Sequence, residues 1–580
     1  MDELDPRLAN AQSSAISSNP AVQQPRPAQA SLADAIPDAR GANFFTEDAV
    51  FARLLSLYTD DKLRALLTPR LERLGELAGD TLDTLAGEAD RNGPTLVSRS
   101  RRGEDVNEIH YHPAYRQMEA LAFGEFGLAS MSHRAGTFGA DSPLPPVVKY
   151  ALTFLFAQSE FGLLCPVSMT DSLARTLKRY GSPELIDRYL PRLGNQDMAE
   201  LFQGAMFMTE QGAGSDVSAT AVSATPGPDN TWTLHGDKWF CSNADADVAL
   251  VLARRQGAGP GLKAVSLFLL PKVLPDGSAN QYRIVRLKDK LGTRSMASGE
   301  IRLEGATAWL IGDPEAGFRQ MADMVNSSRL SNGVRSAGMM RRAVFEAFHG
   351  ARHRQAFGRR LIDMPLMRRQ LAKMLMPAEQ ARTMFLQCAR EMALADGGDA
   401  GAASRLRVLT PLLKYRACRD ARKVVGDAME VRGGCGYIEE WPEPRLLRDA
   451  HLGSIWEGTS NIVALDVLRA VRRDNGLQAW RSWVEQHLQH SPWPEAATQL
   501  PRVVALVEAA LLDERLTRSA AAAMYNLGTA VAMHWEADQL DDASRAALAR
   551  LVLAHRLTPK DPLAPNEVSE AELAVLFQAV

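Results

Sequence analysis

Features that define several common protein classes are scarce in this sequence of 580 residues. Its five cysteines are scattered, odd in number and free of CxxC spacing, so we expect neither a disulfide framework nor a zinc site. They are Cys165, Cys241, Cys388, Cys418 and Cys435. No uninterrupted apolar run reaches the roughly 18 to 20 residues that cross a bilayer. The formal net charge is only -3, so bulk charge does not indicate a nucleic acid or a membrane as partner.

The chain is too long for one compact core, which predicts three or four domains. Its first residues, MDELDPRLAN, carry acids, which signal and transit peptides avoid. Unpaired cysteines suit a reducing compartment. We therefore expect a cytoplasmic protein with no membrane segment.

Composition and apolar periodicity divide the chain into five regions. Residues 1–45 are rich in Ala, Pro, Ser and Gln, which predicts a flexible arm because such a segment buries too little apolar surface. Helical spacing over 46–203 predicts a helical domain, and short β-branched runs over 204–312 predict a β domain. Helical patterns return over 313–475 and continue over 476–580. The expected fold class is α+β and multidomain.

The clearest motif, MFMTEQGAGSD at residues 206–216, lies where the β domain begins. Three small residues from Gly212 to Gly214 let the backbone approach a ligand closely. Thr209 and Ser215 add hydroxyl donors beside exposed amides, which suits a pyrophosphate or a ring edge. A glycine-rich turn without a ligand is the commoner explanation for such a loop taken alone. The dinucleotide fingerprint GxGxxG does not apply, because a strand and not a helix follows.

Four further stretches follow in order: HGDKWFCSNADAD at 235–247, RLKDKLGTRS at 286–295, ARHRQAFGRR at 351–360, and VRGGCGYIEEWPEPRLLRDAHLGSIWEGTSN at 431–461. Together the five stretches resemble the acyl-CoA dehydrogenase family over roughly residues 100 to 470. CPVSMT, SIWEGTSNIVALDVLR and the extra helical region resemble its AidB branch, which is named for the adaptive response to DNA alkylation.

The resemblance implies an N-terminal helical domain, a middle β-barrel domain, a C-terminal helical bundle and an additional C-terminal helical region. It also implies FAD as cofactor, with Phe240 against the flavin ring and Ser242 near flavin N5. Arg354 and Phe357 would reach the FAD of a neighbouring subunit, so a homotetramer is expected. The residues implied to bind FAD are Met206, Phe207, Met208, Thr209, Glu210, Gln211, Gly212, Ala213, Gly214, Ser215, Phe240, Cys241, Ser242, Arg354, Phe357, Ile455, Trp456, Gly458, Thr459, Ser460, Asn461 and Leu465.

Glu457 is a lone carboxylate between Trp456 and Gly458. Removal of a weakly acidic thioester α-proton needs a base in a dry pocket, and Trp456 would supply a bulky wall for it. The resemblance places the base of the family at Glu457. A rival position used by some relatives holds Ser328 here, and a hydroxyl cannot serve as that base. The alternative is a Glu that merely caps the start of a helix.

The resemblance also places Arg329 and Arg469 in the substrate pocket. We predict that Arg469 pairs with Glu457 and makes it a weaker base. The alternative for Arg469 is a solvated cation at a helix end.

The implied partners are an acyl-CoA substrate and an electron-transferring flavoprotein as acceptor, with no metal. The alternative function is a DNA-associated flavoprotein that protects against alkylation with little turnover. Residues 477–580 contain 8 Lys and Arg against 13 Asp and Glu, the wrong sign for duplex DNA. Residues 326–376 carry 11 Lys and Arg against 2 Asp and Glu, either a basic face or cations that meet acids of other segments. Glu430 and Pro365 depart from the family pattern at positions expected to contact adenosine.

Overall fold

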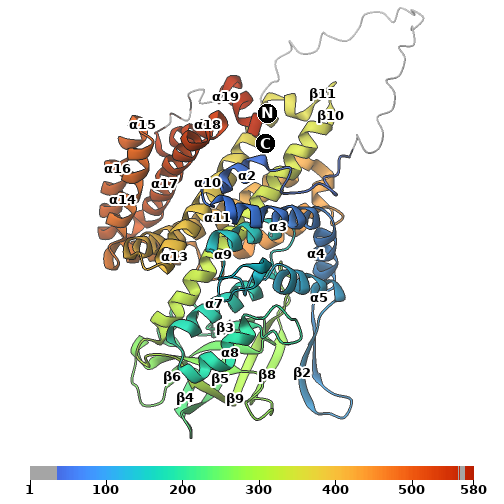
Figure 1. Ribbon diagram of the computed structural model, residues 1–580, viewed down its shortest axis with the longest axis vertical. Helices are drawn as coiled ribbons and strands as arrows, with labels where there is room; N and C mark the ends of the chain where they lie inside the picture. Colours follow the sequence, from blue (N-terminus) through green and yellow to red (C-terminus); the bar gives the residue numbers. More distant parts are fainter. Residues whose placement is uncertain (1–35, 560, 562, 564–567, 580) are drawn as a thin grey trace, which may run out of the picture.

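The computed structural model describes residues 36–559, 561, 563 and 568–579 (Figure 1). Residues 1–35 of the predicted flexible arm lie outside this part of the chain. Phe44 and Phe45, which we assigned to the arm, are buried in the core. The Phe44 ring lies 5.2 Å from that of Phe345, so the prediction was wrong at these two positions because aromatic burial anchors them.

The N-terminal part is helical and carries one β-hairpin. Its elements are α2 (Ala49–Leu55), α3 (Asp61–Gly79), α4 (Thr81–Arg91), β1 (Thr95–Arg99), β2 (Asp105–His110), α5 (Pro113–Glu119), α6 (Pro146–Phe156), α7 (Leu164–Tyr180) and α8 (Pro183–Leu193). The sequence did not predict the antiparallel hairpin β1–β2. It depends on tertiary contacts, because Asn107 donates to the Tyr282 carbonyl at 3.3 Å and accepts from the Ile284 amide at 3.1 Å.

The middle part is a closed β-barrel, drawn at the lower end of Figure 1. Its strands are β3 (Gly204–Phe207), β4 (Ser223–Pro226), β5 (Thr231–Ser242), β6 (Val248–Arg255), β7 (Val265–Pro271), β8 (Tyr282–Leu287) and β9 (Ser298–Leu310). The pairing order β6-β4-β5-β9-β7 returns to β6, which closes the ring, while β3 joins β6 and β8 joins β9. The predicted β-barrel is confirmed.

Long helices form the third part. They are α9 (Gly317–His353), α10 (Pro365–Asp396), α11 (Ala400–Arg432), α12 (Pro442–Gly453) and α13 (Ser460–Arg473), with a small hairpin of β10 (Gln355–Ala356) and β11 (Arg359–Arg360) between α9 and α10. Helix α9 begins at the barrel and ends at the β10–β11 hairpin, so one helix joins the two ends of the molecule (Figure 1).

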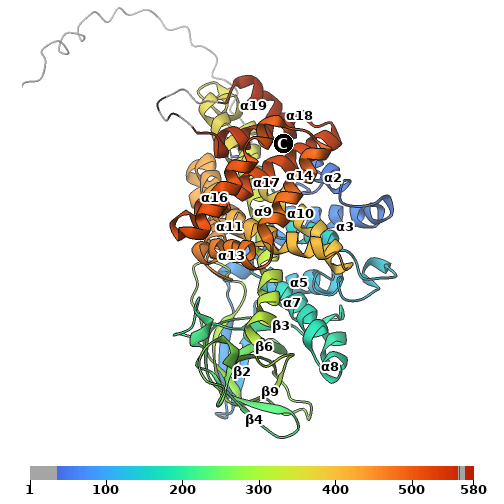
Figure 2. The same cartoon turned by 90° about the vertical axis from the view of Figure 1, so that its left-hand side faces the viewer.

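The additional C-terminal helices pack along the flank of this bundle (Figure 2). They are α14 (Gly476–His490), α15 (Pro494–Ala497), α16 (Leu500–Leu512), α17 (Thr517–Leu540), α18 (Ala543–Val552) and α19 (Glu570–Leu576). The predicted class, α+β with a helical, a β-barrel and two further helical parts, is therefore confirmed.

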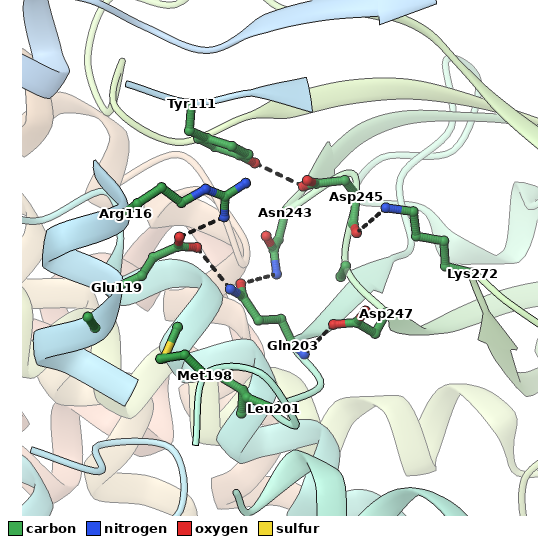
Figure 3. A pocket seen from close by; sticks show the side chains of 12 residues that line it. Tyr111, Arg116, Glu119, Met198, Leu201, Gln203, Asn243, Asp245, Asp247 and Lys272 are labelled. Carbon is green, nitrogen blue, oxygen red and sulfur yellow. Dashed lines mark hydrogen bonds and ion pairs between the residues drawn. The ribbon is translucent and has the colours of Figure 1, made fainter. Parts of the chain in front are cut away.

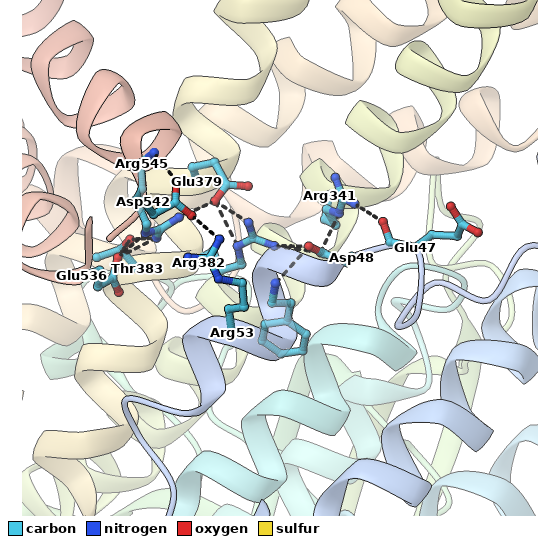
Figure 4. Close-up of polar contacts among 11 residues, drawn as sticks. Glu47, Asp48, Arg53, Arg341, Glu379, Arg382, Thr383, Glu536, Asp542 and Arg545 are labelled. Atoms are coloured by element: carbon cyan, nitrogen blue, oxygen red, sulfur yellow. Dashed lines mark hydrogen bonds and ion pairs between the residues drawn. The ribbon is translucent and has the colours of Figure 1, made fainter. Parts of the chain in front are cut away.

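Buried ion pairs fix the additional helices to the bundle (Figure 4). Arg545 on α18 contacts Glu379 on α10 at 2.8 Å and Glu536 on α17 at 2.6 Å. Arg382 on α10 contacts Asp48, just before α2, at 2.7 Å. Charges in such surroundings are stable only when they are paired. The network therefore connects the first described helix with the last long ones.

Three arginines of the basic stretch over 326–376 are paired with acids outside this stretch. Arg341 contacts Asp48 at 2.7 Å, Arg342 contacts Asp83 at 3.2 Å, and Arg368 contacts Glu570 at 2.7 Å. These cations meet acids of other segments, which was the second of the two interpretations.

Among the described residues, no helix combines the length and the apolar character needed to span a bilayer. Within the same part of the chain, no three His, Cys, Asp or Glu side chains gather where they could hold a metal ion.

The ion-pair network predicts a large effect of Arg545→Ala. The change leaves the Glu536 carboxylate buried without its cation and leaves Glu379 with Arg382 alone, so we expect a loss of about 3 to 5 kcal/mol. The measurement is the urea midpoint of unfolding. Arg550→Ala, an exposed arginine on the same helix, is the matched control, and an equal midpoint for the two variants would contradict the role of the network.

Candidate active site

The Glu457 carboxylate lies against α9, in the connection between α12 and α13. Its side chain is 6% exposed. The Ser328 hydroxyl donates a hydrogen bond to Oε1, and the Asn332 amide donates to Oε2 at 3.2 Å. Ser328 and Asn332 are four residues apart and therefore share one helix face. This face holds the carboxylate by both oxygens.

Cations hold the backbone around Glu457. Arg329 donates from Nε to the Glu457 carbonyl at 2.9 Å. The Lys414 ammonium donates to the carbonyls of Trp456 at 2.8 Å and Gly458 at 2.6 Å. Burial lowers the pKa of Lys414, although Cys418 and Glu457 oppose this effect. Glu457 itself has φ 56° and Gly458 has φ 102°, so two successive residues occupy the left-handed region that is costly for a non-glycine residue.

Aromatic rings and a buried guanidinium form the wall beside the carboxylate. The Trp456 ring stacks on Phe161 with centroids 5.9 Å apart. The Arg335 guanidinium lies 4.8 Å from the Phe161 centroid and 5.0 Å from the Trp456 centroid. Its Nη2 lies 4.0 Å from Glu457 Oε1. Glu457 therefore has a dry wall and a cation beside it.

The structure contradicts the predicted pairing of Arg469 with Glu457. Arg469 is 51% exposed and contacts Asp466 at 2.9 Å. Arg329, the other arginine predicted in the substrate pocket, contacts the same Asp466 at 2.7 Å. Arg469 lies nine residues beyond Ser460, about 14 Å along α13 at 1.5 Å per residue. The cation beside Glu457 is Arg335, which the sequence analysis did not single out.

The loop after β3 is open to a ligand. Gly212, Gly214 and Ser215 are exposed, and no described atom lies within 4 Å of a β-carbon placed on either glycine. The Thr209 carbonyl accepts from the Trp239 amide at 2.8 Å, which fixes the loop beside β5. The structure thus brings the predicted loop next to the predicted strand end.

The end of β5 presents an aromatic ring and a hydroxyl on its outer face. Phe240 is 57% exposed, and the Lys288 ammonium lies 3.2 Å from the Trp239 ring centroid. The Ser242 hydroxyl is half-buried and lies 3.5 Å from that of Ser298. An exposed ring beside a hydroxyl is a suitable surface for a flat heterocycle.

Three residues predicted to bind the cofactor point elsewhere. Phe207 and Cys241 are buried in the barrel core. Glu210 contacts the buried Lys238 at 2.7 Å and accepts from the Ala221 amide at 2.6 Å. Side chains alternate between the two faces of a strand, and the prediction took whole segments without separating those faces. Only the backbone of these three residues remains available to a ligand.

Most other residues predicted to bind FAD lie in β3, in the loop after it and around Glu457. Met206, Met208 and Thr209 are half-buried, Gln211 is exposed, and Ala213 is buried. Near Glu457, Ile455, Thr459 and Asn461 are exposed, whereas Ser460 and Leu465 are half-buried.

Arg354 and Phe357 lie far from Glu457 within one chain. Arg354 follows α9 and donates to the Arg432 carbonyl at 3.1 Å. Phe357, in the β10–β11 hairpin, is 96% exposed. Arg354 is 26 residues beyond Ser328, about 39 Å along the helix axis. Figure 1 shows the hairpin at the opposite end from the barrel.

Sequence reasoning missed Asn332, Arg335 and Lys414 and dismissed Ser328. The available signal was a polar face on α9, with positions 328, 332 and 335 separated by four and three residues. Only the fold shows that this face meets the segment around Glu457.

A separate pocket of about 450 Å³ lies at the rim of the barrel (Figure 3). Within it, Tyr111 donates to Asp245 at 2.9 Å and Gln203 donates to Glu119 at 2.8 Å. Burial raises the pKa of Glu119, against the effect of Arg116. These polar groups satisfy one another, and Glu457 does not line this pocket.

Comparisons with known proteins assign the family. The AidB N-terminal domain matches residues 35–198, and the acyl-CoA dehydrogenase middle and C-terminal domains match 205–306 and 315–472. The putative acyl-CoA dehydrogenase AidB of Escherichia coli K12 is 36% identical over 402 residues, 67% of this chain and 71% of that protein. Acyl-CoA dehydrogenase family member 11 of Caenorhabditis elegans is 33% identical, over 77% of this chain and 73% of that protein. The chain belongs to the acyl-CoA dehydrogenase family, and its N-terminal part is of the AidB kind.

Solved structures agree with this assignment. Caenorhabditis elegans ACDH-11 in complex with C11-CoA gives a TM-score of 0.82 at 27% identity and covers 98% of this chain and 94% of that one. Bd2924 in its apo-form gives 0.80 at 32% identity, over 86% of this chain and 99% of that one.

The backbone at Gly458 predicts that Gly458→Ala is destabilising. A β-carbon there would lie 3.1 Å from Ile462 Cγ2 and 3.4 Å from an Arg329 nitrogen, at φ 102°. We expect a cost of about 1 to 3 kcal/mol, measured as a lower melting temperature. The control is Gly350→Ala in α9, which meets no described atom within 4 Å and should be neutral or slightly stabilising. Equal melting temperatures for the two variants would contradict the constraint.

Proposed function

We propose that the chain is an FAD-dependent acyl-CoA dehydrogenase in which Glu457 removes the α-proton of an acyl-CoA. The observation that carries this proposal is the placement of one carboxylate, nearly buried, beside Trp456 and held by Ser328 and Asn332. A base so placed has a fixed direction and little water around it, which favours proton abstraction from carbon.

The exposed surfaces of β5 and of the loop after β3 fit FAD. Gly212 and Gly214 leave room for a diphosphate against the backbone, Phe240 offers an exposed ring, and Ser242 offers a hydroxyl. FAD, when bound, supplies the acceptor for the hydride that leaves the β-carbon of the substrate. The α-proton passes to a carboxylate oxygen of Glu457, so the two losses leave a double bond between the α- and β-carbons.

The rest of the segment positions Glu457 and its substrate. Arg329 binds the backbone carbonyl of Glu457, and Lys414 binds the carbonyls of the residues before and after it. These bonds fix the backbone, so the Glu457 amide can donate to the thioester carbonyl. Stacked Trp456 and Phe161 exclude water from this side.

We further propose a homotetramer in which Phe357 and Arg354 complete the cofactor site of a neighbouring subunit. The exposed position of Phe357 and the length of α9 support this arrangement. An electron-transferring flavoprotein is the proposed acceptor. Duplex DNA is left out of the proposal, because Arg341, Arg342 and Arg368 are paired with acids.

Replacing the base should separate chemistry from cofactor binding. Glu457→Gln keeps the shape of the side chain and one acceptor oxygen for the hydrogen bonds from Ser328 and Asn332, but removes its basicity. We expect full FAD content and flavin reduction slower by about 10² to 10⁴ fold. The measurement is anaerobic titration with a panel of acyl-CoAs, followed by bleaching of the flavin absorbance. Reduction as fast as in the wild type would show that Glu457 is not the base.

The cofactor should be held without a covalent bond. The loop after β3 offers backbone amides and hydroxyls, and Cys241 beside it is buried in the barrel. Acid precipitation of the purified yellow protein should release all of the colour into the supernatant. Colour that stays in the pellet would overturn this proposal.

A further inference from the structure

Arg335 differs from the other buried arginines of this fold. Arg382 and Arg545 each contact two carboxylates at hydrogen-bond distance (Figure 4). Arg335 is 0% exposed, yet its two terminal nitrogens have no hydrogen-bond partner among the described residues. Its Nε donates weakly to the Ser331 carbonyl at 3.4 Å. A buried guanidinium with so few partners is costly for stability.

The Arg335 guanidinium faces the Glu457 carboxylate. Nη2 lies 4.0 Å from Oε1, and the ring centroids of Phe161 and Trp456 lie 4.8 and 5.0 Å from the guanidinium, within cation–π range. Because Arg335 is fully buried, a diffusing ligand does not reach it. Its charge therefore acts on Glu457.

We propose that Arg335 is a positioning residue for the base, which keeps the Glu457 carboxylate charged and fixed in direction. This inference rests on the proposed function for its catalytic meaning, but the coupling between the two side chains does not. The low polarity of the surrounding rings strengthens an interaction between charges at this distance. Arg335, and not Arg469, is the cation beside the Glu457 carboxylate.

The other cations near Glu457 do not contact its carboxylate, because they bind other groups. Lys414 bonds to backbone carbonyls and Arg329 pairs with Asp466. The titratable groups that act on Glu457 from other elements are Cys165 on α7 and Lys414 and Cys418 on α11. Asp466 on α13 interacts with Arg329, and Lys290 interacts with Cys165. Burial raises the pKa of Cys165 to about 11 and lowers that of Lys290 to about 8, so the thiol is neutral at pH 7.

The first test is a double-mutant cycle in the melting temperature of the FAD-loaded protein. It compares Arg335→Gln, Glu457→Gln and the double variant. Each single change leaves one buried charge without its partner, so we expect the double variant to lose less than the sum of the two single losses. Additive losses would overturn the proposal. This cycle needs no substrate, so it gives an answer even if no acyl-CoA reduces the flavin.

The second test is the pH dependence of flavin reduction. A neighbouring cation favours the charged carboxylate, so its removal lets Glu457 take up a proton at higher pH. We expect the acid limb in Arg335→Gln to move upward, and Arg335→Lys to return it most of the way. Arg319→Gln, an exposed arginine on the same helix, is the charge-matched control.

The outcomes separate the two claims. Non-additive melting temperatures without flavin reduction by any acyl-CoA would keep the pairing and sink the proposed function. An acid limb that stays in place in Arg335→Gln, or moves equally in Arg319→Gln, would overturn the positioning role while the dehydrogenase activity stands.

Discussion

The candidate site depends on the contact between one face of α9 and the connection between α12 and α13, which carries Glu457. Ser328 and Asn332 bind both carboxylate oxygens, and Arg329 holds the neighbouring carbonyl. Helix α9 also begins at the barrel and ends at the β10–β11 hairpin. The same rigid element therefore sets the direction of the proposed base and its distance from the barrel surface that fits FAD.

Burial and positive charge act together at Glu457. Two buried cations, Arg335 and Lys414, lie near a single nearly buried carboxylate. Burial alone favours the neutral form of a carboxyl group, whereas a neighbouring cation favours the charged form. An enzyme that needs a charged base in a dry pocket must balance these two effects. The arrangement found here places both effects on the same carboxylate.

The sequence predicted the class of fold, the barrel and the residue proposed as base, because each depends on local pattern or on a family motif. It failed where distant segments meet. Asn107 bonds across to β8 and stabilises an unpredicted hairpin, and Phe44 packs on α9. Arg335 and Arg469 lie on different helices, and only the fold shows which of them reaches Glu457. Likewise, alternation along β5 decides that Phe240 is exposed and Cys241 is buried.

We propose that Glu457 exchanges the α-proton of a bound acyl-CoA. The most direct measurement is deuterium incorporation at the α-carbon of an acyl-CoA incubated anaerobically with the protein in D₂O, followed by mass spectrometry. We expect incorporation with the wild type and none above background with Glu457→Gln. Equal incorporation with both proteins would contradict it.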